Sequence, residues 1–441
     1  MNNLTLSTAA LMIMSINIYG ESLSDSLESV QTVFEGSAAE EITQQPIKVR
    51  SVRNILGEYD LMEHTKGQLR AGYITFSEDG ASRTSAYALG GHYHFNTKRW
   101  NGLMIGAEAY TVLNLGINQN FLNLNGDFFD ENGKSFILLS QAYLDGKWGN
   151  TEIKLGRQVL DTPHADSDDI RMIPNYFEAY TITNTDIDDL TLTAGLIRKM
   201  AGWENAINSA DFVNVGETLG TSKESDGIYY ASASYEGIKD LSLSLWYYNY
   251  NDIANVIYAE AGYSYALAKE TTLTFGLQYD SSEETGASLL RKQDANTYGL
   301  SMELASESMG VHILAAYNKD TGETGAMGLS LGGGPFFTSM EDQTLDAIGT
   351  AGSAWLIGAG YHFETIGIDG LNAGIAYGNF KAKNNSHYES KEIDIVIDYS
   401  LNEKFSLTVA YASVQFDAGL DNNGDPLQDY DQFRVIANYN F

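Results

Sequence analysis

Residues 151–184 read TEIKLGRQVLDTPHADSDDIRMIPNYFEAYTITN, with an alternating run at each end and a polar loop between them. In the first run Ile153 and Leu155 alternate with polar residues, and the second run begins at Tyr176. A period of two predicts β-strands. Most hairpins close in two to five residues, so the connection at residues 159–174 is unusually long and is expected to be functional or disordered.

The same alternation recurs along the rest of the chain. In one run Ile393 and Ile395 flank Asp394, which gives that strand one apolar and one polar face. We identify about eighteen such runs, and nearly all are at least as long as the roughly 9–11 residues that a tilted strand needs to cross a bilayer. They lie near residues 67–78, 83–97, 101–113, 135–148, 151–158, 175–183, 189–198, 226–236, 239–250, 253–265, 270–282, 294–306, 309–318, 353–363, 370–380, 387–399, 404–416 and 428–441.

The connections between these runs alternate in length. Every second connection is short, at residues 98–100, 149–150, 185–188, 237–238, 266–269, 307–308, 364–369 and 401–403. Most others are longer, at residues 114–134, 159–174, 199–225, 283–293, 319–352 and 417–427. Short turns on one side and long loops on the other are typical of outer-membrane barrels. The sequence therefore predicts an all-β fold, a transmembrane antiparallel β-barrel of about 18 strands with short periplasmic turns and long extracellular loops.

Composition limits the classes of protein that fit. The chain has 58 acidic against 26 basic residues and a net charge of −32, which argues against binding to nucleic acid. No window of about 18 apolar residues after the N-terminus predicts a transmembrane helix. A transmembrane barrel gives a weak hydropathy signal, because only every second strand residue faces lipid. The absence of cysteine suits a chain exported through an oxidising periplasm.

Both ends of the sequence indicate export to the outer membrane of a Gram-negative bacterium. Residues 1–20 contain an apolar core followed by a small residue, as in a signal peptide, although they lack Lys and Arg. We expect residues 21–66 to form a periplasmic tail or small plug, and residues 67–441 to form the barrel. The final strand places Phe433 and Phe441 on one face. A terminal Phe is similar to the signal that the barrel-assembly machinery reads, so this machinery is an expected partner.

A barrel of about eighteen strands encloses water rather than a packed core. Charged residues opposite the apolar faces are expected to line this lumen, because Lys or Arg facing lipid would cost about 2–4 kcal/mol at mid-depth. The expected pore-lining acids are Asp145, Glu152, Glu392, Asp394 and Asp398. The expected pore-lining bases are Arg70, Lys154, Lys404 and Arg434.

The loop at residues 159–174 is predicted to fold inward and narrow the pore. Its expected constriction residues are Asp161, Asp166, Asp168, Asp169 and Arg171. Rings of carboxylates favour cations, and an arginine orients carboxylate-bearing solutes by bidentate hydrogen bonds. We therefore predict a lean toward cations. Replacing Asp166, Asp168 and Asp169 by Asn should weaken that lean, as measured by the reversal potential in a salt gradient.

Several short motifs occur within and beside this loop. They are Gly156-Arg157-Gln158, Thr162-Pro163, Asp168-Asp169-Ile170-Arg171-Met172-Ile173-Pro174 and Phe177-Glu178. These motifs look like the OprD-like family of outer-membrane porins, and the layout of residues 67–441 is similar too. The resemblance implies that Arg171 and the loop acids line the eyelet and that Arg70, Lys154 and Arg434 form a basic track. The strongly acidic balance departs from the family's expected preference for anions.

Two weaker patterns concern metals. His92 and His94 share one strand face without a third ligand, so we interpret them as lumen-facing side chains rather than a metal site. Asp421, Asn423 and Asp425 suggest weak calcium binding by a surface loop, although the pattern of an EF-hand is incomplete. We otherwise expect no cofactor and no metal.

The preferred function is passive diffusion of ions and small hydrophilic solutes, with amino-acid or carboxylate types among them. One alternative is a receptor or adhesin that binds through the long loops 199–225 and 319–352. A less favoured alternative is a barrel hydrolase, with His164 as the tempting base but no nucleophile paired with it in the sequence. Expected partners are outer-membrane lipid and small solutes, and the expected oligomer is a monomer or a trimer.

Overall fold

The computed structural model describes residues 62–118, 123–205, 208–290, 292–325, 329–384, 387–420 and 424–441. The expected signal peptide at residues 1–20 and nearly all of the expected tail at residues 21–66 lie outside these ranges. The first strand begins at Met62, somewhat before the predicted start of the barrel at residue 67.

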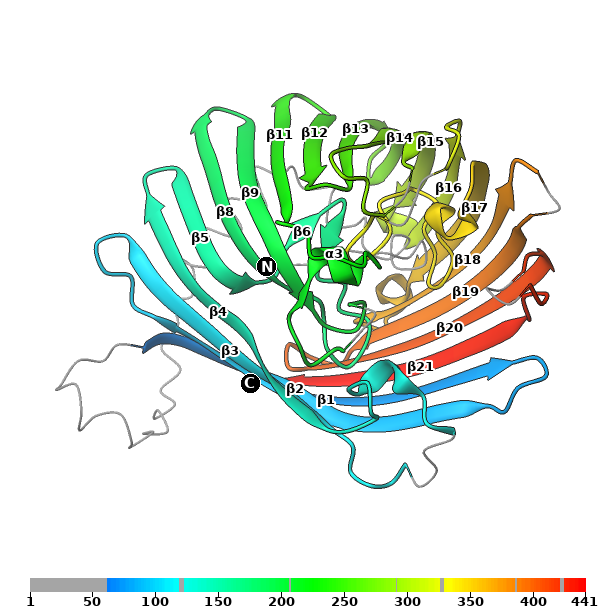
Figure 1. Cartoon of the computed structure of the whole chain (residues 1–441), viewed down its shortest axis with the longest axis horizontal. Helices are drawn as coiled ribbons and strands as arrows, with labels where there is room; N and C mark the ends of the chain where they lie inside the picture. Colours follow the sequence, from blue (N-terminus) through cyan, green and yellow to red (C-terminus); the bar gives the residue numbers. More distant parts are fainter. Residues whose placement is uncertain are drawn as a thin grey trace.

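Eighteen long strands form a closed antiparallel barrel (Figure 1). They are β1 (Met62–Glu78), β2 (Thr84–Thr97), β3 (Leu103–Leu113), β4 (Phe136–Trp148), β5 (Thr151–Gln158), β8 (Tyr176–Ile187), β9 (Leu190–Ala201), β11 (Ile228–Ile238), β12 (Leu241–Tyr250), β13 (Ala254–Ala268), β14 (Thr271–Glu284), β15 (Asp294–Ser306), β16 (Val311–Asp320), β17 (Gly352–His362), β18 (Leu371–Ala382), β19 (Glu389–Ser400), β20 (Phe405–Ala418) and β21 (Tyr430–Asn440). Pairing of β1 with β21 closes the sheet, so neither strand leaves an unpaired edge in lipid. The predicted fold class and strand number are confirmed.

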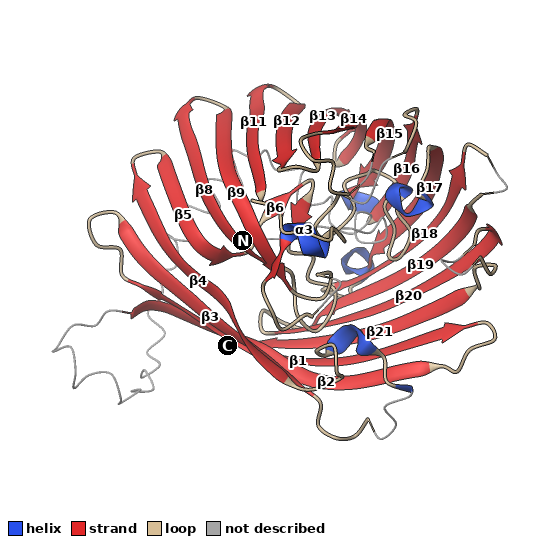
Figure 2. Ribbon diagram, viewed as in Figure 1, coloured by secondary structure: helices blue, strands red, loops and turns tan. Residues whose placement is uncertain are grey.

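The remaining elements are short. β6 (Asp161–Thr162) and β7 (Ala165–Asp166) form a small separate hairpin, and β10 (Val213–Asn214) adds to the end of β9. Within the described ranges, the helical segments are single turns in connections (Figure 2): η3 (Gly126–Phe128), α3 (Val215–Thr218), η4 (Glu307–Met309), η5 (Leu345–Ile348) and η6 (Phe363–Ile366). None of the helices in the described ranges is long and apolar enough to span a membrane.

Each spanning strand has an outer and an inner set of side chains. On β19, Ile393, Ile395 and Ile397 are exposed on the outer face. Their neighbours Glu392 and Asp394 are fully buried on the inner face. The outer set faces lipid in an outer-membrane barrel. Glu392 and Asp394 are buried because L7, the connection at residues 321–351, covers them from inside the barrel.

The described parts of four long connections include residues that pack against the inner wall of the barrel. We name them by their order among the long-side connections: L2 (residues 114–135), L3 (159–175), L4 (202–227) and L7 (321–351). In Figure 1, β6 of L3 and α3 of L4 lie within the ring of strands. The receptor alternative placed residues 319–352 on the outer surface. Instead, the described part of L7 lies against the inner wall, because its apolar side chains have partners there.

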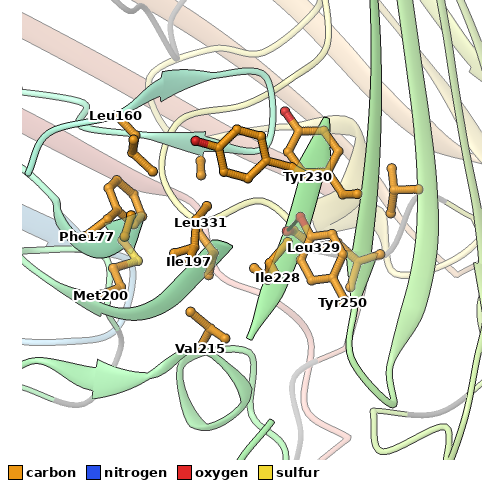
Figure 3. Packing of buried hydrophobic residues seen from close by; sticks show 14 of the residues in the cluster. Leu160, Phe177, Ile197, Met200, Val215, Ile228, Tyr230, Tyr250, Leu329 and Leu331 are labelled. Atoms are coloured by element: carbon orange, nitrogen blue, oxygen red, sulfur yellow. Dashed lines mark hydrogen bonds between the residues drawn. The ribbon is translucent and has the colours of Figure 1, made fainter. Parts of the chain in front are cut away.

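Apolar clusters hold these loops to the wall. In the cluster shown in Figure 3, Leu160 of L3, Val215 of L4 and Leu331 of L7 meet inner-wall side chains that include Ile197 and Tyr250. L3 and L7 are also joined by a parallel bridge between Ala165 and Leu331. Full burial of a large apolar side chain contributes about 1.5–3 kcal/mol, so this contact is a substantial anchor.

Two further clusters complete the attachment. Phe128 of L2 and Met172 of L3 pack against inner residues of β1 to β3. Phe336 and Met340 of L7 pack against β16 to β18. Gly378 of β18 leaves room for Met340 there, because a Cβ at this position would overlap with the methionine sulfur. The inner wall is thus shaped to receive the loops, and the loops narrow the lumen.

Candidate functional site

Arg171 of L3 lies where the four inward loops meet. Its guanidinium carbon is 4.6 Å from the ring centre of Trp203 in L4. Its Nε is 3.8 Å from Oδ2 of Asp127 in L2, and its Nη2 is 4.0 Å from Oδ1 of Asp342 in L7. Burial, and then the nearby charge of Arg434, lowers the pKa of Arg171, but a guanidinium stays protonated in proteins. One buried cation therefore contacts side chains from three other loops.

Arg70 fixes L3 to the wall. From β1 its guanidinium reaches both carboxylate oxygens of Asp169 in L3, with Nη2 donating to Oδ2 at 2.8 Å. Nη1 also donates to the backbone oxygen of Arg171 at 2.8 Å, and Nε donates to Asn438 Oδ1 at 2.7 Å. Asp169 keeps 47% of its side chain exposed, whereas Arg70 is buried. Arg70 is therefore a clamp, and the carboxylate is the part of the pair that faces water.

Arg434 fixes L7 in a similar way. From β21 its Nη2 donates to Oε2 of Glu341 at 2.9 Å, and the two side chains are only 3% and 2% exposed. The adjoining backbone of L7 is held by two wall carboxylates on β19. Asp394 accepts the N–H of Glu341 at 3.1 Å, and Glu392 accepts the N–H of Asp342 at 2.8 Å. Four of the wall charges predicted as pore-lining thus hold loops: Arg70, Arg434, Glu392 and Asp394.

The acids of L3 divide into two groups. Asp161 and Asp169 are exposed. Asp166 and Asp168 are buried within the loop, where the N–H of Asp168 donates to Asp166 Oδ1 at 3.2 Å. The backbone oxygen of Asp168 accepts the indole N–H of Trp203 at 2.9 Å. When Asp166, Asp168 and Asp169 are replaced by Asn, the loss of the exposed Asp169 is therefore expected to change the ion preference most.

The other predicted pore-lining residues lie toward the short-turn side of the loops. Lys154 on β5 places Nζ 4.1 Å from the ring centre of Tyr143. Asp145 on β4 accepts a hydrogen bond from Arg99 at 2.7 Å, and Asp398 on β19 accepts one from Thr408. Glu152 lies on β5 and is partly exposed.

Lys404 departs from its prediction. It lies exposed in the turn that precedes β20, which begins at Phe405. The strand starts one residue later than the prediction of 404–416, so Lys404 is a rim residue and does not line the wall.

Several residues at the meeting point of the loops were not predicted from the sequence. Asp127, Trp203, Glu341 and Asp342 all come from long connections without alternation. A cavity of about 400 Å³ is lined by residues of L2 and L4, including Asp127, Trp203 and Glu131. The only sequence signal for these residues was the length of their loops. A long loop indicates function but does not show whether the loop folds into the barrel or away from it.

His164 and His94 each contact a carboxylate of the inner wall. His164 of L3 contacts Oδ2 of Asp280 on β14 through Nε2 at 2.6 Å, with both side chains buried, so this histidine attaches L3 to the far wall. His94 Nδ1 lies 3.4 Å from Glu108 Oε2 on the inner wall. No group of three or more ligating side chains suited to a metal occurs in the part of the chain described. The suggested calcium residues Asp421 and Asn423 lie outside it.

The barrel is closed, its outer face is apolar, and inward loops narrow its lumen around a charged centre. These features define the class of outer-membrane channels. A family model described as "outer membrane porin, OprD family" matches residues 130–441. The chain therefore belongs to the OprD family of outer-membrane porins of Gram-negative bacteria, and the resemblance inferred from the motifs is confirmed. Proteins of this family are channels. No curated protein matches the chain.

Solved structures share the fold at low sequence identity. Pseudomonas aeruginosa OpdK with vanillate aligns with a TM-score of 0.69 and 19% identity over 86% of this chain and 99% of that chain. Acinetobacter baumannii OccAB3 aligns with a TM-score of 0.72 and 14% identity over 87% and 99%. Pseudomonas aeruginosa OccK8 (OprE) aligns with a TM-score of 0.68 and 19% identity over 86% and 99%.

Proposed function

We propose that this porin is a water-filled channel for passive diffusion of ions and small hydrophilic solutes, with a preference for cations. The observation that supports the preference is the charge balance around Arg171. Arg70 and Arg434 are already paired with carboxylates, and Arg171 has Asp127 and Asp342 beside it. The exposed charges that remain for a passing solute are mainly carboxylates, which attract cations.

The carboxylates beside Arg171 also affect which organic solutes can pass. OpdK was solved with vanillate, a carboxylate. In this chain a carboxylate that approaches Arg171 would also approach Asp127 and Asp342, and like charges repel. We therefore propose that solutes with an ammonium group, amino acids among them, pass more readily than simple carboxylates.

Uptake into liposomes tests this function. Purified protein should let small amines and amino acids into liposomes faster than carboxylates of the same size, and empty liposomes should let neither in. Equal exclusion of all these solutes would contradict the proposed channel. Faster entry of carboxylates would leave the channel in place and contradict the preference.

Asp342 makes the ion preference depend on pH. Burial raises the pKa of Asp342 to about 6, the charges of Arg171 and Arg434 lower it, and Glu341 and Asp127 raise it. Asp342 is therefore ionised above about pH 6 and neutral below it. One unit charge about 6 Å from a passing ion in water at about 0.1 M salt lowers the energy of a cation, and raises that of an anion, by about 0.4 kcal/mol. The ratio of their permeabilities therefore changes by about 0.8 kcal/mol, or roughly threefold to fourfold. The ratio of cation to anion permeability should fall about threefold between about pH 7.5 and about pH 5.

Reversal potentials measured across this pH range check the prediction. Asp342→Asn should already have the lower ratio at neutral pH and should lose most of the change with pH. If the variant keeps the full wild-type pH profile, Asp342 is not the titrating group.

A further inference from the structure

The inner faces of β9, β11, β12 and β13 present hydroxyl groups on the short-turn side of the loops. Cross-strand pairing aligns one row of side chains: Thr193, Ser232, Trp246 and Tyr258. The next row toward the short turns consists of Thr191, Ser234, Ser244 and Glu260. Opposite side chains in a sheet have Cβ atoms about 5 Å apart, and diagonal ones about 7–8 Å. These two rows therefore form one continuous patch, which we call the hydroxyl patch.

Trp246 is the aromatic centre of the hydroxyl patch. Its ring stacks with that of Tyr248, with centroids 5.9 Å apart and planes at 9°, and its centroid is 6.3 Å from that of Tyr230. Tyr230 lies over Gly195, where a Cβ would come within 2.6 Å of its ring. Figure 3 shows Tyr230 at the edge of the apolar cluster that anchors L3 and L7. Trp246 packs against this cluster but is only partly buried, so part of its ring is accessible from the lumen.

The polar groups around Trp246 have unused hydrogen-bonding capacity. The hydroxyls of Ser232, Ser234 and Ser244 make no hydrogen bond within the described ranges, and these three residues are partly exposed. Glu260 accepts the hydroxyl of Tyr258 through Oε2. Its Oε1 has no donor among the described side chains. The patch thus combines one aromatic face, three hydroxyls that can both donate and accept, and one carboxylate acceptor.

We propose that the hydroxyl patch is a subsite for a neutral, polyhydroxylated ring solute, such as a pyranose sugar. The C–H face of the ring packs on Trp246, and its hydroxyls bond to the three serines and Glu260. The proposal rests on the proposed function, because a solute reaches the patch only through an open channel. It adds a second solute class, at a place separate from the charged meeting point of the loops.

The chemistry of the two rows favours this solute class over an ion. Neither row contains Lys or Arg, so an anion would find no opposite charge. An organic cation would use Trp246 through a cation–π contact and Glu260 through its charge, but it would leave the serines without a role. A sugar ring uses all of these groups, and aromatic packing together with several hydrogen bonds is what orients a small ligand.

Current blockade by sugar in a planar bilayer tests the proposal with the full chain. Glucose should reduce the ion current of the wild-type channel in a saturable way, and triethylene glycol, an uncharged solute without a ring, should reduce it only weakly. Trp246→Ala should raise the apparent Kd for glucose roughly tenfold, as expected for the loss of an aromatic packing contact. Trp246→Phe keeps an aromatic face and should lose less.

Two further variants separate the possible ligands. Tyr247→Ala changes the adjacent, outward-facing aromatic residue and should leave the blockade unchanged. Glu260→Gln keeps an oxygen acceptor and should alter the Kd for glucose by less than about threefold. Tetramethylammonium serves as the cationic probe.

The outcomes are distinguishable. Equal effects of glucose and triethylene glycol on the wild type, or an unchanged Kd in Trp246→Ala, would overturn the sugar subsite. Blockade by tetramethylammonium that disappears in Glu260→Gln, without blockade by glucose, would replace it with a cation site. The current before any sugar is added reports separately on the channel, so its absence would refute the proposed function itself and this subsite with it.

Discussion

Arg434→Met should release L7 from the inner wall and enlarge the pore. Glu341, only 2% exposed beside Arg434, would be left as a buried charge without a partner. Breaking such a pair costs about 3–5 kcal/mol, which is comparable to the apolar anchoring of L7 through one or two large side chains. We expect larger and noisier single-channel conductance, together with new protease cleavage within residues 329–351.

The double variant Glu341→Gln with Arg434→Met is the matched control. It removes both charges, so it should restore most of the wild-type conductance and protease resistance. Arg70→Met should change conductance and protease resistance less than Arg434→Met does. Its partner Asp169 is 47% exposed and therefore remains solvated when the arginine is lost. Wild-type conductance in Arg434→Met would show that the pair does not hold L7.

Replacing both Asp127 and Asp342 by Asn should reverse the ion preference. These two carboxylates lie nearest to Arg171, at 3.8 Å and 4.0 Å. Each contributes roughly threefold to the ratio of cation to anion permeability, so their joint loss should lower it by about tenfold. Arg171 would then lose the two carboxylates nearest to its guanidinium, and anions should be favoured.

Glu131→Gln is the control for this double variant. Glu131 lines the same cavity as Asp127 but has no contact with Arg171 in the described structure. Its replacement should change the ratio by less than twofold. A double variant that stays as cation-selective as the wild type would place the selectivity outside the contacts of Arg171.

The barrel was predictable because its pattern repeats in every strand. Lipid on one face and water on the other impose a period of two. Counting the alternating runs predicted the strand number, and the alternating lengths of the connections predicted the side of each loop. Boundaries were less certain, as Lys404 shows. Its polarity fits both a lumen-facing strand residue and an exposed turn residue, and only the pairing of β19 with β20 distinguishes them.

The site was predictable only in part. Parity placed Arg70 and Arg434 inside the barrel, and the motif around Arg171 singled out L3. Their partners could not be deduced, because contacts such as Arg434 with Glu341 join segments far apart in the sequence. The inward course of L7 was missed because Phe336 and Met340 occur in a loop without periodicity, where apolar residues are equally compatible with a surface patch.

The reversal potential of the purified channel in a planar bilayer, with a tenfold gradient of KCl, tests the proposed cation preference most directly. We expect steady conductance steps and a potential whose sign shows that K⁺ passes more readily than Cl⁻ at neutral pH. Absence of steps would contradict the proposed channel, and a potential of the opposite sign would contradict the assignment of its charges.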